Sequence, residues 1–130
     1  MTPPVIERWI EILDTGRTDE LRDLLTADAV FRSPAVFTPQ EGRDKAVAYL
    51  AAAAKLFAGN GFRYVEKWYG EHSAVLEFVA EVDGIHVNGI DMIHWNDDGR
   101  ITSVKVMLRP LKALQVVIPE MGRLLQQAQG

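Results

Sequence analysis

The second half of the chain alternates between apolar and polar residues in four segments, and a turn signal separates each segment from the next. The segments are residues 62–69, 73–82, 85–95 and 100–108, and the breaks read "GEH", "DG" and "NDDG". Alternation with a period of two is typical of strands that bury one face, and short breaks containing Gly or Asp favour hairpins. The pattern therefore predicts a four-stranded antiparallel meander.

Helical periodicity predicts three helices before this meander. Prolines 3 and 4 suit the first turn of a helix over about residues 4–15, which Gly16 ends. Thr18 can cap a short second helix, whose apolar residues are Leu21, Leu24 and Leu25. A short strand over residues 29–34 precedes a third, Ala-rich helix from Arg43 to Phe57.

Apolar spacing after Pro110 predicts a C-terminal helix, which Pro119 should kink or split. Strands that are grouped in the sequence, rather than alternating with helices, indicate an α+β fold with helices against one face of a sheet. A length of 130 residues fits a single domain over residues 1–130.

Composition excludes several classes of function. The net charge of −4 argues against a nucleic-acid surface, and the absence of cysteine excludes disulfides and thiolate sites. Three histidines without paired carboxylate spacing predict no metal site. We find no signal peptide and no apolar run of the roughly 20 residues that span a bilayer, so the expected location is cytoplasmic, away from membranes.

Asp91 is the unusual residue of the meander. It shares a strand face with Val87, Gly89, Ile93 and Trp95, so the alternation places a carboxyl group on the more apolar side of the sheet. Such a group is consistent with three roles: a proton donor in catalysis, a ligand hydrogen bond without turnover, or a structural bond to a buried tyrosine or tryptophan.

Two segments carry a family resemblance. "IERWIEILDTGRTDELRDLLTADAVFRSP" and "GIDMIHWNDDGRITSVKVMLRP" resemble the SnoaL-like branch of the nuclear-transport-factor-2-like superfamily, which has the ketosteroid-isomerase fold. The resemblance implies a cone-shaped curved antiparallel sheet wrapped around the N-terminal helices, with an apolar pocket at the wide end. Such folds host isomerases, cyclases, dehydratases, epoxide hydrolases and proteins without catalytic activity.

The resemblance also implies roles for single positions. Asp91 matches the aspartic acid that ketosteroid isomerases keep protonated as a hydrogen-bond donor to a substrate oxyanion. Trp9 stands where those enzymes carry the oxyanion-hole tyrosine, and Ser33 stands where they carry the aspartate base. Because serine cannot accept a proton at neutral pH without a base of its own, we do not expect true ketosteroid isomerase activity.

Limonene-type epoxide hydrolases in the superfamily use an Asp-Arg-Asp arrangement. This chain lacks that arrangement, so epoxide hydrolysis is the less favoured enzymatic function. Here Gly89 replaces the arginine two residues before Asp91, and the positions facing Asp91 on the next strand are valine and leucine. A glycine beside Asp91 would instead leave space for a ligand to approach the backbone.

We therefore predict a pocket for a small, largely apolar molecule, with cofactor-free proton transfer of the isomerase, cyclase or dehydratase type and Asp91 as acid or oxyanion donor. The alternative is a non-catalytic ligand-binding or dimerisation module. The predicted pocket residues are Trp9, Phe31, Ser33, Tyr49, Phe57, Trp68, Gly89, Ile93, Val106 and Leu108.

The outward face of the meander predicts a homodimer. It carries apolar residues among polar ones, and an apolar surface of this extent favours a protein contact. The residues are Val75, Val79, Ile90, Met92, Ile101 and Met107.

Overall fold

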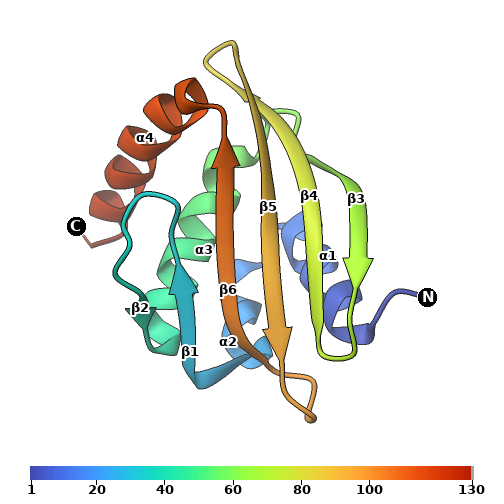
Figure 1. The fold of residues 1–130 in the computed structure, drawn as a ribbon. Coiled ribbons are helices and arrows are strands. Elements are labelled where there is room, and N and C mark those ends of the chain that lie inside the picture. The colour runs from blue at the N-terminus through green and yellow to red at the C-terminus, as the bar shows by residue number, and fades with distance from the viewer. Residues whose placement is uncertain (130) are drawn as a thin grey trace.

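The computed structural model describes residues 1–129 and has helices on one face of a curved six-stranded sheet (Figure 1). The strand order is β2-β1-β6-β5-β4-β3. The strands are β1 (Leu25–Arg32), β2 (Gln40–Glu41), β3 (Arg63–Tyr69), β4 (Ser73–Val82), β5 (Ile85–Trp95) and β6 (Ile101–Arg109). The α+β fold class and the predicted four-stranded meander are confirmed.

The first strand makes the sheet mixed. β1 pairs in parallel with β6, whereas every other pair is antiparallel, so the sheet is mixed rather than purely antiparallel. A crossover through several elements separates β1 from β6, and such a connection permits parallel pairing where a hairpin does not. The two-residue β2 was not predicted from the sequence.

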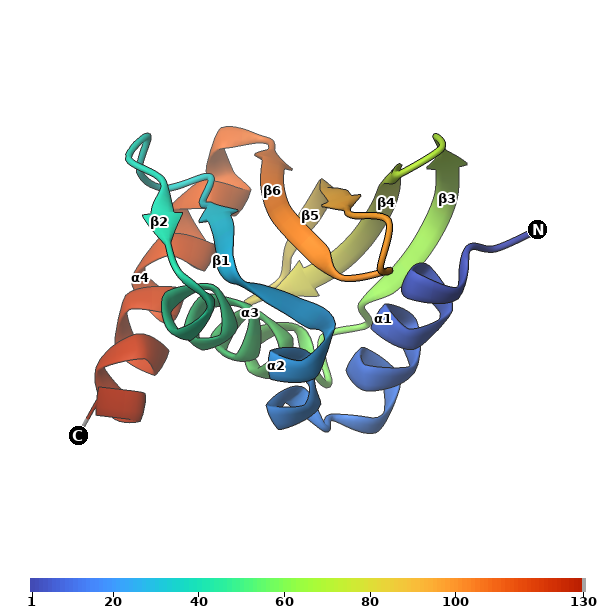
Figure 2. The same cartoon turned by 90° about the horizontal axis from the view of Figure 1, so that it is seen from below.

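The helices are α1 (Pro4–Thr15), α2 (Leu21–Leu24), α3 (Arg43–Phe57) and α4 (Leu111–Gln129), with a 3₁₀ turn at Thr18–Glu20 before α2. Figure 2 shows them together on one side of the sheet, while the opposite face is uncovered. The predicted bounds of α1 and α3 are confirmed. None of the described helices is long and apolar enough to cross a membrane.

The predicted helix signals hold at Gly16 but not at Thr18, which is the first residue of the 3₁₀ turn and caps no helix with its side chain, nor at Pro119. Gly16 adopts the left-handed conformation (φ 74°) after α1, and its N–H donates to the carbonyl of Ile12. α4 runs through Pro119 as one helix, so the expected split does not occur. Packing of its apolar side accounts for this continuity, because Ala113, Val117 and Leu124 are buried against the sheet and α3.

Two clusters of buried side chains join the layers. The first lies under α1 and α2 and is centred on Trp9, Ile12, Leu76 and Ile93. The second lies between α4, the end of α3 and strands β4 and β5, and it includes Phe57, Phe78, Val87 and Val117. Asp91 is the one buried charged residue in the part of the chain that the structure describes.

Irregularities in the strand ladder reverse the faces of two predicted residues. The register shifts between Tyr64 and Glu66, so Trp68 lies opposite Val75 on the outer face with 49% of its surface exposed, and not in the pocket. A second shift between His94 and Trp95 turns Ile101 inward, where it is fully buried, and not outward. An extra residue in one strand inverts the side-chain alternation beyond it.

Candidate functional site

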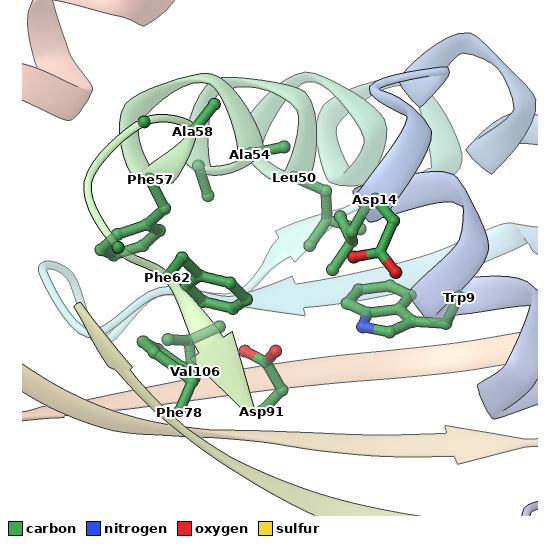
Figure 3. Close-up of a pocket in the computed structure, with 14 residues that line it drawn as sticks. Trp9, Asp14, Leu50, Ala54, Phe57, Ala58, Phe62, Phe78, Asp91 and Val106 are labelled. Atoms are coloured by element: carbon green, nitrogen blue, oxygen red, sulfur yellow. The ribbon is translucent and has the colours of Figure 1, made fainter. Parts of the chain in front are cut away.

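A cavity of about 380 Å³ lies between α1, α3 and the inner face of the sheet (Figure 3). This volume is within the range that holds small organic ligands. Apolar side chains provide most of its wall, and two carboxyl groups provide its charge. The lining residues are Trp9, Leu13, Asp14, Leu50, Ala53, Ala54, Phe57, Ala58, Gly59, Gly61, Phe62, Phe78, Asp91 and Val106.

Strand β5 places Asp91 in this cavity. Asp91 pairs with Leu76 of β4 and Val106 of β6, so apolar side chains stand on both sides of it in the sheet. Only 7% of the residue is exposed. Burial of an unpaired carboxylate is costly, which means that the surroundings must either donate hydrogen bonds or keep the group protonated.

Tyr64 of β3 and Trp9 of α1 join Asp91 in a chain of hydrogen bonds. The Trp9 indole N–H donates to the Tyr64 hydroxyl oxygen over 3.0 Å, and the Tyr64 O–H donates to Asp91 Oδ2 over 2.6 Å. Among the hydrogen bonds of residues 1–129, none involves Asp91 Oδ1. The second carboxyl oxygen is therefore available to a molecule in the cavity.

Burial raises the pKa of Asp91 to about 6, although the hydrogen bond from Tyr64 acts in the opposite direction. Burial also raises the pKa of the Tyr64 phenol, and the charge of Asp91 raises it further, so Tyr64 is a donor at neutral pH. Because Tyr64 already donates to Oδ2, the proton of a neutral Asp91 resides on Oδ1. Protonated Asp91 thus presents an O–H donor to the cavity.

An aromatic cluster forms the wall beside this donor. The ring centroid of Phe62 lies 5.4 Å from that of Phe57, 4.9 Å from that of Phe78 and 5.1 Å from that of Tyr64. These distances are typical of favourable aromatic packing. The cluster keeps the surroundings of Asp91 apolar, which strengthens any hydrogen bond that the carboxyl group makes there.

The other carboxyl group of the lining belongs to Asp14, in the last turn of α1. Asp14 is exposed, unlike Asp91, and Figure 3 shows its carboxyl group beside the Trp9 ring. No lysine, arginine or histidine is among the described lining residues. The electrostatics of the cavity therefore disfavour a carboxylate or phosphate ligand and are compatible with a neutral or cationic one.

The structure brings some of the predicted pocket residues together at the cavity and places others in the core. Trp9, Phe57, Val106 and Asp91 line it. Phe31 and Tyr49 stack on each other with centroids 5.2 Å apart, and Ile93 is fully buried in the first core cluster; none of these three is in the lining.

Ser33 and Leu108 line a separate hollow of about 490 Å³ beside the loop that follows β1. The Ser33 hydroxyl accepts a hydrogen bond from the Ala35 N–H over 2.9 Å, so it serves the loop. Val106 contributes to both hollows. The position matching the isomerase base thus lies outside the cavity that contains Asp91.

Gly89 does not leave the open space that the sequence suggested. A Cβ atom there would lie 2.6 Å from Leu108 Cδ2, 2.6 Å from Phe78 Cζ and 2.7 Å from the Met107 carbonyl oxygen. Neighbouring side chains and backbone pack so closely against Gly89 that no side chain fits there. Close approach of this kind is the other common reason for glycine within a strand.

Sequence reasoning missed Tyr64 and Asp14. Tyr64 could have been found by alternation, because it lies two residues from Phe62 in the same segment, on the predicted inner face. Asp14 carries a weaker signal, a carboxylate at the C-terminal end of a helix, where positive residues are favoured. No group of three or more potential metal ligands occurs among the residues that the structure describes.

The chain belongs to the SnoaL-like domain family, which matches it over residues 6–104. It is similar to a steroid delta-isomerase from Pseudomonas aeruginosa, with 35% identity over 96% of this chain and 91% of that one, and a TM-score of 0.91. It is also similar to an uncharacterized bacterial protein with a cystatin-like fold from Silicibacter pomeroyi, with 28% identity, 92% and 84% coverage, and a TM-score of 0.85.

A putative SnoaL-like polyketide cyclase from Jannaschia sp. shares the fold at lower similarity. Its identity is 14%, the alignment covers 90% of this chain and 96% of that one, and the TM-score is 0.69. No curated protein matches the chain. The structural relatives therefore include an isomerase and a cyclase, and the fold is of the nuclear-transport-factor-2-like type.

Proposed function

We propose that the cavity binds a small, largely apolar molecule with one polar oxygen, and that protonated Asp91 donates a hydrogen bond to that oxygen during proton transfer. The observation that carries this proposal is the buried Asp91 carboxyl group, held by Tyr64 through Oδ2 with Oδ1 left for a ligand. A donor aimed at a developing oxyanion in an apolar site stabilises that charge strongly.

The isomerase described for Pseudomonas aeruginosa and the cyclase described for Jannaschia support this class of reaction. Isomerisation and cyclisation of this kind move protons within the substrate, dehydration also releases a water molecule, and acid–base side chains can catalyse all three without a cofactor. The rival function is binding without turnover. The two are distinguished by whether a bound molecule undergoes chemistry that depends on Asp91.

Binding can be tested with 2-naphthol, a bicyclic phenol that resembles the enol form of a ketone. We expect it to quench the fluorescence of Trp9, and we expect Asp91→Ala to weaken binding by roughly tenfold, the effect of one lost hydrogen bond. Asp91→Asn retains a donor and should bind nearly as well. Native protein that binds no 2-naphthol at millimolar concentration would contradict the proposed pocket.

A pair of substitutions on α3 locates the probe. Ala54 lines the cavity, whereas Ala48 is exposed on the same helix. Ala54→Leu should fill part of the cavity and abolish binding, and Ala48→Leu should leave binding unchanged. Equal binding by both variants would place the probe elsewhere.

Turnover of a 3-oxo-Δ5 steroid tests the comparison with ketosteroid isomerases. We expect turnover far below that of ketosteroid isomerases, because Ser33 supplies no carboxylate at the position of their base and lies outside the Asp91 cavity. Because Ser33 lines a separate hollow, we do not expect Ser33→Asp to gain this activity. Robust turnover by the native protein, followed by the conjugated product's ultraviolet absorbance, would overturn this expectation and make the protein a steroid isomerase.

A further inference from the structure

Two carboxyl groups line the cavity in contrasting surroundings. Asp91 is buried in the sheet, whereas Asp14 is exposed and approaches from α1 (Figure 3). Among the described lining residues no other side chain is acidic or basic. Below about pH 6 the buried Asp91 carboxyl group is largely protonated and can donate a hydrogen bond, and a second carboxyl group in a wetter position on the same cavity is the arrangement that divides acid and base roles in proton-transfer enzymes.

Helix stability does not account for Asp14. It lies in the last turn of α1, where the unsatisfied carbonyl groups create a partial negative charge that disfavours a carboxylate. Within residues 1–129, Asp14 takes part in no side-chain hydrogen bond and no ion pair. The Asp14 carboxylate is therefore not engaged by other described side chains and can contact a molecule in the cavity.

Asp14 is also coupled to the hydrogen-bonded chain on the other side of the cavity. Its charge contributes, after burial and Asp91, to the raised pKa of the Tyr64 phenol. The Tyr64 oxygen in turn lies 2.6 Å from Asp91 Oδ2. Because Asp14 and Asp91 line the same cavity of about 380 Å³, one small molecule can contact both carboxyl groups.

We propose that Asp14 is the proton acceptor of this site, and that it takes the proton from a carbon adjacent to a carbonyl group whose oxygen is bound by Asp91. This inference rests on the proposed function. In this proposal the base lies on α1, whereas ketosteroid isomerases carry their base at the position that Ser33 occupies in this chain.

The step balances within the substrate and the two side chains. The Asp14 carboxylate removes a proton from the carbon, the C–H electron pair forms the carbon–carbon double bond, and the carbonyl π pair moves to oxygen. The O–H of Asp91 stabilises the resulting enolate through a hydrogen bond. Asp14 then returns the proton to the same or a conjugated carbon, so no further reactant is consumed.

Exposure of Asp14 is compatible with this role. The aspartate base of ketosteroid isomerase has only a modestly raised pKa and succeeds because the oxyanion is stabilised at the same time. Positioning and the hydrogen bond to the oxygen provide most of the acceleration in such a scheme. The required base is therefore a carboxylate within reach of the substrate, and not a strongly basic group.

Exchange of a carbon-bound proton tests Asp14 without knowledge of the natural substrate. The probe is 2-tetralone, a bicyclic ketone, in D₂O, with loss of the proton signal beside the carbonyl followed by NMR. We expect the native protein to accelerate exchange above the buffer rate. Asp14→Asn should lower that acceleration by roughly 10²–10⁴-fold, the usual contribution of a general base.

Matched variants separate catalysis from structure. Asp14→Glu keeps the carboxylate and should recover part of the exchange, while Asp14→Asn should bind 2-naphthol with an unchanged dissociation constant. Asp28 is exposed on β1 and lines no described cavity, so Asp28→Asn is the control and should behave as the native protein does.

Each result decides the assignment. Native rates in Asp14→Asn would overturn Asp14 as the base, and the proposed function would stand if Asp91→Ala still lost exchange. A native protein that binds 2-naphthol but does not accelerate exchange would also overturn Asp14 as the base, leaving the binding module. Lost exchange with retained binding, partly recovered in Asp14→Glu, would support the assignment.

Discussion

At the scale of single residues, the buried Asp91 carboxyl group makes stability depend on pH. Its pKa is about 6 in the folded protein and about 3.8 in an unfolded chain, so the native state holds the proton over a wider range. The contribution of Asp91 to the free energy of unfolding is then highest below about pH 4 and falls as the pH rises towards 6. The full loss is on the order of 3 kcal/mol.

Asp91→Asn removes this dependence, because an amide cannot ionise. We expect the difference in stability between native protein and variant to change across pH 4–6 and to be constant above it, as measured by urea unfolding at several pH values. Parallel curves for the two proteins would contradict the buried acid, as would an NMR titration placing the Asp91 carboxyl group near pH 4.

Tyr64→Phe removes the hydroxyl that connects Trp9 to Asp91. Since the Tyr64 bond lowers the pKa of Asp91, its loss should move that pKa above about 6. Leaving the Trp9 N–H and Asp91 Oδ2 without this partner should also cost about 1–3 kcal/mol of stability. NMR titration and urea unfolding measure the two effects, and Tyr69→Phe, at an exposed tyrosine of the same strand, is the control.

At the scale of elements, Gly89 fixes how closely β5 approaches β6. An added methyl group would meet the Met107 carbonyl oxygen at 2.7 Å as well as two side chains, and backbone cannot move aside cheaply. We expect Gly89→Ala to destabilise the protein by about 1–3 kcal/mol in urea unfolding. Gly122 of α4 has open space around its Cβ position, so Gly122→Ala should be neutral or stabilising by up to about 1 kcal/mol.

Periodicity specified the elements well and the strand faces less well. The helices over Pro4–Thr15 and Arg43–Phe57 and the four strands of the meander follow from apolar spacing and turn residues. Trp68 and Ile101 changed faces because a single extra residue in a ladder inverts every side chain beyond it. No local pattern marks where such a bulge will form.

The candidate site was predictable only in part for a related reason. Asp91 stands out because a charge on an apolar strand face is visible in the sequence itself. The contact between Tyr64 and Asp91 joins residues 27 positions apart on non-neighbouring strands, and Asp14 approaches from a helix. Those contacts depend on sheet order and on the packing of α1, which a single sequence does not encode as spacing.

At the scale of the whole molecule, the uncovered face of the sheet favours a homodimer. Trp68 and Met107 are about half exposed there, and partly buried apolar residues of β4 and β5 surround them. We propose that a second copy of the chain covers this surface, because a broad apolar surface is costly to leave in water. The outer-face apolar residues are Trp68, Val75, Val79, Ile90, Met92 and Met107.

We expect light scattering at micromolar concentration to give the mass of a dimer. Met92→Glu places a charge near the centre of this face and should give a monomer, because an unpaired charge in an apolar interface is strongly unfavourable. Lys45→Glu, on the exposed side of α3, should leave the dimer intact. A monomeric native protein would show that the sheet face is not an interface between copies.

The alanines of α3 have a consequence for how ligand preference can change over evolutionary time. Ala53 and Ala54 line the cavity from a single helix, and Ala58 lines it from the residue directly after that helix, while the chemical groups belong to other elements. Every alanine codon is one nucleotide substitution away from a valine codon. Point mutations along this helix can therefore reshape the cavity in small steps and alter which molecules fit, while Asp91, Tyr64 and Asp14 keep their positions.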